Sequence, residues 1–164
     1  MMHYTAYLAH CDILLKQDYL FATDADMLFV DKIGDEILGE RVATLHPGFA
    51  PGSKYPRSQG AYETNPISKA YVQNGEGKPY FAGGFYGGTA EEMLRIAEIN
   101  TVHIYQDLQK NVIAIWHDES HWNRYCIDNP PTIILSPSYC YPENWDMPYP
   151  KKLLALDKNH GEIR

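Results

Sequence analysis

The sequence predicts a single α/β domain in which short strands and helices alternate along the chain. A length of 164 residues with 45% hydrophobic residues is sufficient for one domain with a hydrophobic core. Short apolar runs of strand length alternate with segments whose apolar residues recur every three or four positions, which is the spacing of a helix. Polar or glycine-rich clusters follow three of the predicted strands, at the position where ligands bind in α/β sheets.

The first part of the chain predicts two helices, two strands and a long loop. Apolar residues spaced three or four apart favour an amphipathic helix over residues 1–16. Residues 19–22 predict a short buried strand, residues 33–38 a brief helix and residues 41–45 a second strand. Residues 47–65 are rich in Pro, Gly, Ser and Tyr with little periodicity, and long loops in compact domains tend to be functional.

A third strand and a capped helix follow. Residues 78–82 have a strand pattern that runs into residues 83–88, where four of the six residues are glycine. This density of glycine means that the backbone passes very close to another segment or to a ligand. Thr89 is a predicted N-cap with Glu92 three residues later, so the two residues predict a capping box that opens a helix over residues 90–98.

The last third of the chain predicts two further helices and two further strands. We expect residues 102–110 to form a second helix and the apolar residues 113–116 to form a short strand. Residues 122–128 favour a helix that ends before Pro130-Pro131, because proline and the residue before it disfavour helical backbone. Residues 132–135 predict the final strand.

Charge and cysteine usage limit the function classes. A net charge of −7 and a pI of about 5.4 argue against a protein held on nucleic acid by phosphate neutralisation. Cys11, Cys126 and Cys140 form no Cys-x-x-Cys pair, so neither a disulfide framework nor a structural zinc site is indicated. The chain shows no signal sequence and no apolar run long enough for a membrane span. We therefore expect a soluble protein in the reducing cytoplasm.

Two carboxylates, Asp24 and Asp26, follow the first predicted strand with one small residue between them. In an extended segment they would point the same way and repel each other unless a cation lies nearby. A hard divalent ion such as Mn²⁺ or Mg²⁺ prefers oxygen ligands and keeps positions open for phosphates. The alternative is that residues 23–26 form a turn, since Asp and Thr are good turn formers.

The segment from His117 to His121 carries Asp118, Glu119 and Ser120 between two histidines. Histidines four residues apart on a helix can bind zinc, so a zinc hydrolase is one interpretation. However, the zincin pattern places Glu directly after the first His, where this chain has Asp118. A structural alternative is that Asp118 or Ser120 caps a helix.

Six segments match a known family in order and in near-spacing. They lie at residues 18–26, 44–49, 83–88, 116–121, 135–137 and 158–160, and include Asp-Ala-Asp, Thr-Leu-His-Pro-Gly-Phe, Gly-Gly-Phe-Tyr-Gly-Gly, Trp-His-Asp-Glu-Ser-His, Leu-Ser-Pro and Lys-Asn-His. Together they resemble glycosyltransferase family 6, which includes the histo-blood-group A and B transferases. The resemblance runs from about residue 18 to residue 164 and is closest to the short soluble bacterial or phage-type members.

The resemblance implies a GT-A glycosyltransferase fold with a Rossmann-like mixed sheet. It also implies transfer of N-acetylgalactosamine or galactose from a UDP-sugar to the 3-hydroxyl of a β-galactoside, forming an α-1,3 linkage with retention of configuration. Asp24 and Asp26 match the pair that holds Mn²⁺, with Mg²⁺ as an alternative, on the UDP diphosphate. Glu119 matches the catalytic glutamate that faces the anomeric carbon, where a carboxylate could act as a nucleophile or stabilise positive charge.

Further site residues also follow from the resemblance. His46, Trp116 and Glu119 match acceptor-binding positions. The donor-binding positions correspond to Asp118, Ala82, Gly83, Gly84, Lys158, His160 and Arg164. A glycine at position 84 leaves the space that an N-acetyl group needs, so we expect UDP-GalNAc to be preferred over UDP-Gal. Ala61 stands where the blood-group enzymes have a hydroxyl-bearing acceptor contact, so the resemblance does not define which β-galactoside is the acceptor.

The resemblance begins inside the family's catalytic domain. Residues 1–164 are therefore expected to form a single but N-terminally incomplete GT-A domain that lacks the first nucleotide-binding strands and the uracil pocket. A non-catalytic remnant, or a half-domain that needs a partner chain, is the alternative to an active enzyme, and a homo-oligomer is a possible assembly. The expected small-molecule partners are a UDP-sugar donor and a β-galactoside acceptor.

Overall fold

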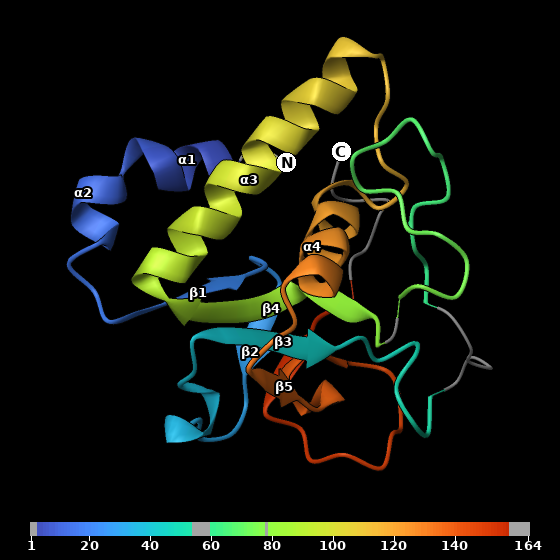
Figure 1. Ribbon diagram of the computed structural model, residues 1–164. Helices are drawn as coiled ribbons and strands as arrows, with labels where there is room; N and C mark the ends of the chain where they lie inside the picture. The colour runs from blue at the N-terminus through green and yellow to red at the C-terminus, as the bar shows by residue number, and fades with distance from the viewer. Residues whose placement is uncertain (1–2, 54–59, 78, 158–164) are drawn as a thin grey trace.

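The structure is a computed structural model that describes residues 3–53, 60–77 and 79–157. Its α-helices are α1 (His3–Ala9), α2 (Cys11–Leu14), α3 (Ala90–Gln109) and α4 (His117–Asp128) (Figure 1). Its strands are β1 (Tyr19–Thr23), β2 (Met27–Phe29), β3 (Arg41–Leu45), β4 (Phe81–Thr89), β5 (Ile133–Leu135), β6 (Tyr141–Pro142) and β7 (Leu153–Ala155). Two 3₁₀ turns, η1 (Asp35–Ile37) and η2 (Pro137–Tyr139), complete the regular elements.

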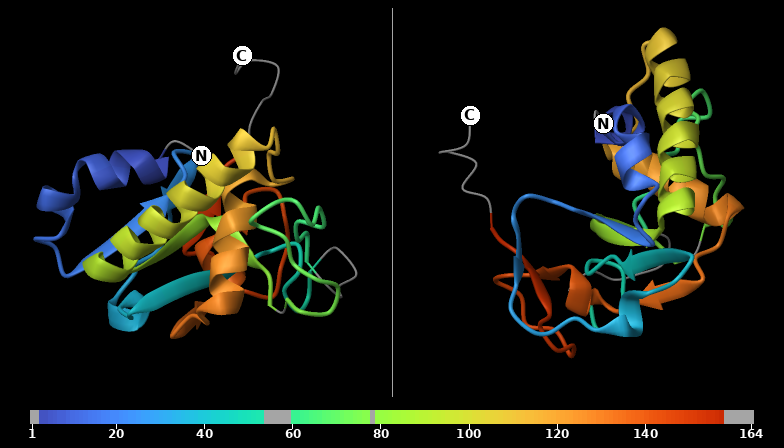
Figure 2. Two further views of the ribbon diagram at one scale, coloured as in Figure 1. Left: turned by 45° about the horizontal axis from the view of Figure 1, so that its top comes forward. Right: turned by 90° about the vertical axis from the view of Figure 1, so that its left-hand side faces the viewer.

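The strands form two mixed sheets. The larger sheet has the order β1-β4-β3-β5, in which β4 pairs antiparallel with both β1 and β3, and β3 pairs parallel with β5. The smaller sheet has the order β2-β7-β6, with β2 antiparallel and β6 parallel to β7. Helices α1, α3 and α4 lie on one side of the larger sheet, and the smaller sheet lies on its other side (Figure 2).

A separate hydrophobic cluster lies on each face of the larger sheet. Successive side chains of a strand point to opposite faces, so neighbours in β3 and β4 enter different clusters. The cluster under the helices includes Tyr4, Ala43, Phe81, Tyr86, Met93, Ile96, Trp122 and Tyr125. The cluster toward the smaller sheet includes Val42, Phe85, Leu135, Tyr139 and Leu153. Strand β4 is therefore buried on both faces, which fixes its position between the two layers.

A buried ionic group ties β3 to the helices. The Arg41 Nε donates to Glu92 Oε1 at 2.6 Å, and the Tyr125 hydroxyl donates to the same oxygen at 2.7 Å. Arg41 also donates to the Pro130 carbonyl at 2.8 Å. Arg41 and Glu92 are almost fully buried, so each charge depends on the other for stabilisation.

Several predicted elements are confirmed. The amphipathic helix over residues 1–16 is confirmed in part, because it is interrupted at His10 and forms the two helices α1 and α2, while residues 1–2 lie outside the described part of the chain. The strand at residues 41–45 has the predicted bounds. Thr89 caps α3 as predicted, because its side chain accepts from the Glu92 N–H. The other half of the predicted capping box is absent, since the Thr89 N–H donates to the Glu40 carbonyl at 3.0 Å and the Glu92 carboxylate binds Arg41. The glycines of β4 do permit close approach: a Cβ atom at Gly88 would lie 2.1 Å from the Glu40 carbonyl oxygen.

Other predictions were wrong. The apolar residues 113–116 are not a strand, because Ile113, Ile115 and Trp116 are exposed and pair with no other strand. One helix of 20 residues replaces the two predicted at 90–98 and 102–110, since the polar Asn100 between them is fully buried. Helix α4 begins at His117, five residues before the predicted start. Strand β1 is only partly buried, because Tyr19 and Thr23 are exposed.

Candidate functional site

A pocket of about 340 Å³ lies where the two sheets and α4 meet. It contains the predicted metal ligands, the predicted catalytic glutamate and part of the predicted sugar site. Its lining residues are Asp24, Asp26, Met27, His46, Pro47, Ala82, Gly84, Glu119, Cys140, Pro142, Trp145 and Ala155. They come from segments up to 131 residues apart, counting from position 24 to position 155, so folding alone brings them together.

The two aspartates lie in a turn, yet both line the pocket. The Met27 N–H donates to the Asp24 carbonyl at 3.2 Å and closes a turn between β1 and β2. The Asp24 N–H donates to the Gly84 carbonyl at 3.1 Å, which holds the turn against β4. The turn that was expected as an alternative is therefore present, and it presents the carboxylates to the pocket.

Glu119 is held at both carboxylate oxygens. The Tyr80 hydroxyl donates to Oε1 at 2.6 Å, and the Gly83 N–H donates to Oε2 at 2.7 Å. Burial raises the pKa of Glu119, whereas these two hydrogen bonds lower it. The nearby charges of Asp118 and Asp24 raise the pKa further.

The start of α4 places the acidic pair at the first turn of a helix. His117 has a φ of 51°, in the left-handed region, where the chain turns sharply into α4. Asp118 and Glu119 follow in the first turn, where the helix dipole favours negative charge. The Trp116 N–H donates to the Ser120 hydroxyl at 3.0 Å, but the N-cap of α4 is Trp116, so neither Asp118 nor Ser120 is the capping residue that was expected as an alternative.

His46 is a neutral hydrogen-bonding group at the wall of the pocket. Burial lowers its pKa to about 4, so its ring carries no charge at neutral pH. The Gly48 N–H donates to His46 Nδ1 at 3.0 Å, which leaves the ring hydrogen on Nε2. The side chain can therefore donate one hydrogen bond to a ligand oxygen.

A second pocket of about 140 Å³ adjoins the first through Asp24. It contains two further residues of the predicted donor site, Gly83 and Asp118. Its lining residues are His3, Tyr7, Ala22, Thr23, Asp24, Ala25, Gly83, Tyr86 and Asp118. His3 Nε2 lies 3.8 Å from Asp118 Oδ2, so α1 also contributes to this side of the site.

Cys140 limits the space at Gly84. A Cβ atom at Gly84 would lie 3.1 Å from Cys140 Sγ and 3.5 Å from Asp24 Oδ2. The first distance is tighter than an ordinary contact, so a larger residue at position 84 would have to displace the cysteine or fill the pocket.

The main pocket has an acidic character that suits a cation. Burial raises the pKa of the Cys140 thiol to about 12, and the charges of Glu119, Asp24 and Asp26 contribute to the same shift. No group of three or more His, Cys, Asp or Glu side chains within the described residues forms a complete metal site. Two aspartates are nevertheless sufficient protein ligands for Mg²⁺ or Mn²⁺ when phosphate oxygens supply the rest.

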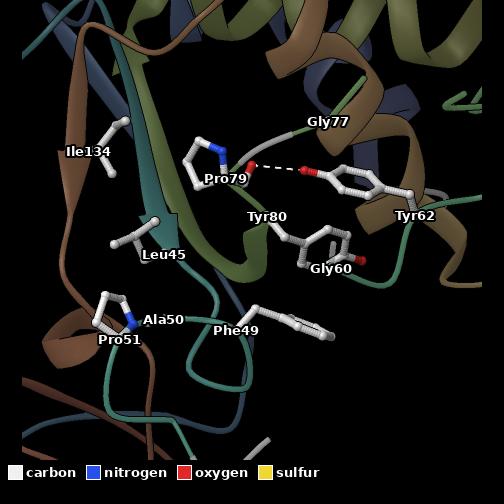
Figure 3. A pocket seen from close by; sticks show the side chains of 10 residues that line it. All are labelled: Leu45, Phe49, Ala50, Pro51, Gly60, Tyr62, Gly77, Pro79, Tyr80 and Ile134. Carbon is white, nitrogen blue, oxygen red and sulfur yellow. Dashed lines mark hydrogen bonds between the residues drawn. The ribbon is translucent and has the colours of Figure 1, made fainter. Parts of the chain in front are cut away.

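A third and larger cavity, of about 500 Å³, lies beside Tyr80. Leu45, Phe49, Ala50, Pro51, Gly60, Tyr62, Gly77, Pro79, Tyr80 and Ile134 line it. Figure 3 shows the rings of Phe49, Tyr62 and Tyr80 along one side, with the Tyr62 hydroxyl bonded to the Pro79 carbonyl at 3.0 Å. Tyr80 lines this cavity with its ring and reaches Glu119 with its hydroxyl.

The remaining predicted site residues lie elsewhere. Trp116 is 52% exposed and does not line the main pocket. Lys158, His160 and Arg164 lie outside the described residues. His121 is buried with its Nε2 3.6 Å from Asp107 Oδ2, whereas His117 is exposed, so the two do not form a zinc site.

Comparison with known proteins identifies the family. The sequence profile of Glycosyltransferase family 6 matches residues 1–164. The chain belongs to glycosyltransferase family 6.

Three vertebrate relatives illustrate the similarity. The chain is 39% identical to rat histo-blood group ABO system transferase 1 over 151 residues. It is 37% identical to the chicken globoside alpha-1,3-N-acetylgalactosaminyltransferase 1 over 154 residues, and 36% identical to the human protein of that name over 150 residues. Each alignment covers 90% of this chain but only 42% or 43% of the relative. The chain thus spans about two-fifths of the length of these relatives.

Several pocket residues of this family 6 chain escaped the sequence prediction. Met27, Cys140, Pro142, Trp145 and Ala155 reach the pocket through the smaller sheet and its connections. Its strands have only two or three residues, too few to show a period.

Across the part of the chain that the structure describes, no helix is both long and apolar enough to cross a membrane.

Proposed function

We propose that this chain is a retaining glycosyltransferase with a GT-A fold that transfers N-acetylgalactosamine, or galactose, from a UDP-sugar to the 3-hydroxyl of a β-galactoside. One observation carries this proposal. Three carboxylates from two distant segments, those of Asp24, Asp26 and Glu119, line one pocket in a chain that belongs to glycosyltransferase family 6. The names of its relatives support N-acetylgalactosamine transfer in an alpha-1,3 linkage.

Asp24 and Asp26 would hold Mn²⁺ or Mg²⁺ together with the diphosphate of the donor. When bound, the ion would offset the negative charge of the diphosphate and so favour its departure. The acidic character of the pocket supports this assignment, because a diphosphate would otherwise meet three carboxylates. In this proposal Lys158, His160 and Arg164 supply further positive charge at the diphosphate.

Glu119 would act on the anomeric carbon. During transfer the bond from this carbon to the diphosphate oxygen breaks, the bond to the acceptor oxygen forms, and the acceptor proton passes to the diphosphate. An ionised Glu119 would stabilise the positive charge that develops on the carbon, or attack it as a nucleophile. His46 would donate a hydrogen bond from Nε2 to an acceptor hydroxyl, Trp116 would provide an aromatic face, and Asp118 and Gly83 would bind donor hydroxyls.

Gly84 supports UDP-GalNAc as the preferred donor. The backbone at this position faces the pocket without a side chain, and Ala82 beside it is also small. The N-acetyl group of the donor would lie in the pocket over the Gly84 backbone.

Isothermal titration of UDP, with and without Mn²⁺, tests the proposal together with an assay of sugar transfer to a β-galactoside. We expect Mn²⁺-dependent UDP binding that is lost in Asp24→Asn/Asp26→Asn. Asp12→Asn is the control, because Asp12 is exposed on α2 and outside the pocket. Absence of UDP binding in both conditions would overturn the proposal. The same result would favour the alternative of a non-catalytic remnant, or of a half-domain that needs a partner chain for nucleotide binding.

A further inference from the structure

Tyr80 directly precedes β4 and contacts Glu119. Its side chain is 4% exposed, and its hydroxyl donates to Glu119 Oε1 at 2.6 Å. A hydrogen bond from a hydroxyl to a carboxylate at this distance is short and strong. None of the six motifs that relate this chain to its family contains Tyr80.

Three aromatic neighbours fix the direction of the Tyr80 ring. The ring centroids of His46, Phe49 and Tyr62 lie 5.5, 5.2 and 5.0 Å from that of Tyr80, all in edge-on arrangements. The backbone is also held, because the His46 N–H donates to the Tyr80 carbonyl at 3.1 Å. The hydroxyl therefore reaches Glu119 from a ring that is packed in place.

The backbone around Glu119 is also held in place. Asn123 of α4 bonds both the N–H and the carbonyl of Phe81 at 2.8 Å. Its amide also donates to the Glu119 carbonyl at 2.9 Å. These hydrogen bonds hold strand β4 and helix α4 together next to Glu119. The Gly83 N–H donates to the second carboxylate oxygen of Glu119, Oε2.

We propose that Tyr80 is a positioning residue that holds the Glu119 carboxylate in a single orientation and keeps it ionised for the transfer reaction. This inference rests on the proposed function. A freely rotating carboxylate would adopt the reactive geometry only part of the time, which would lower the rate. A carboxylate that is held in place adopts this geometry all of the time.

The electrostatics agree with this role. Burial, followed by the charge of Glu119, raises the pKa of Tyr80, so the phenol stays protonated and remains a donor. Its hydrogen bond stabilises the ionised form of Glu119 against burial and against the charges of Asp118 on α4 and Asp24 in the turn after β1. Cys140, which lines the same pocket, stays a neutral thiol, because its pKa is raised to about 12.

The test is Tyr80→Phe, which keeps the ring and removes the hydroxyl. We expect kcat to fall roughly 10- to 100-fold with little change in KM for either substrate, because a charge-assisted hydrogen bond is lost. The acidic limb of the pH–rate profile should move to higher pH. The carboxyl ¹³C resonance of Glu119 should titrate at a higher pH than in the wild type.

Tyr125→Phe is the matched control. Tyr125 donates to a buried glutamate at 2.7 Å, but this glutamate, Glu92, lies outside the site. This variant should lose a similar amount of stability in urea unfolding without moving the Glu119 titration or the pH–rate profile.

Unchanged kcat and an unchanged Glu119 titration in Tyr80→Phe would overturn the inference. If the wild type transfers no sugar, the proposed function fails by itself. The ¹³C titration then still decides whether Tyr80 controls Glu119, since that measurement needs no turnover.

Discussion

The buried histidine of α4 makes the stability of this protein depend on pH. His121 is 2% exposed, and burial lowers its pKa from 6.5 to about 4 in the folded state. In the unfolded chain the imidazole returns to water and to its ordinary pKa near 6.5. Between these two values the unfolded state binds more protons than the folded state. Stability is therefore fully present above about pH 6.5 and is lost as the pH falls toward 4.

The two pKa values give the size of the effect. Proton linkage at this single site predicts that the free energy of unfolding falls by about 1.8 kcal/mol from pH 7 to pH 5, and by about 2.8 kcal/mol from pH 7 to pH 4. The charge of Asp107, whose Oδ2 lies 3.6 Å from His121 Nε2, partly offsets the burial.

Urea unfolding of the wild type and of His121→Gln at pH 7, 6 and 5 measures the contribution of His121 to the free energy of unfolding. Glutamine does not titrate, so the difference in unfolding free energy between the two proteins should shrink by about 1.8 kcal/mol from pH 7 to pH 5. The contributions of other groups largely cancel in that difference. His10→Gln is the control, because His10 is exposed next to α2 and should show the wild-type slope. A difference that stays constant with pH would show that the imidazole of His121 has the same pKa in the folded and unfolded states.

Two further substitutions test the core and the proposed donor site. Arg41→Met should lower the free energy of unfolding by roughly 3–5 kcal/mol, because it removes the nearest cation from the buried Glu92 carboxylate and leaves only the Tyr125 hydroxyl and the more distant Arg95 beside it. Urea unfolding checks this, and a loss below about 1 kcal/mol, or no recovery in Arg41→Met/Glu92→Leu, would contradict it. Gly84→Ala should reduce the use of UDP-GalNAc relative to UDP-Gal by roughly 10- to 100-fold, because the new methyl group occupies the space beside Cys140. Competition between the two donors in one assay measures this ratio, and equal losses with both donors would show that position 84 does not select.

Local signals accounted for the elements that the sequence predicted correctly. The start of α3 depends on the hydrogen bond from the Glu92 N–H to the Thr89 hydroxyl. Both groups lie within four consecutive residues, so the sequence shows the interaction directly. The strand Arg41–Leu45 is a continuous segment of strand length whose residues are all buried except the last one, so no distant residue is needed to recognise it. Such elements can be predicted from the sequence because the interactions that form them join residues only a few positions apart.

Interactions between distant residues explain what the sequence did not predict. The segment at 113–116 resembled a strand, but a side chain holds it: the Ile115 N–H donates to Glu63 Oε2 at 2.6 Å across 52 positions. Likewise, no local pattern indicates that Cys140 lies against Gly84 or that Tyr80 reaches Glu119. The candidate site was predictable where its residues form motifs and was not predictable where its walls come from other parts of the fold.

Strand β4 has consequences for how this protein can vary. At Gly87 and Gly88 a side chain would collide with Phe21 and with the Glu40 backbone, so this end of the strand tolerates no substitution without rearrangement of both neighbouring strands. At Gly84 the nearest obstacle is the Cys140 side chain, which a second substitution can shorten. One strand therefore combines an end that leaves no room for side chains with an end where a neighbouring side chain sets the room. Under the proposed function, sugar preference could therefore be changed at position 84 while residues 87–88 keep the scaffold unchanged.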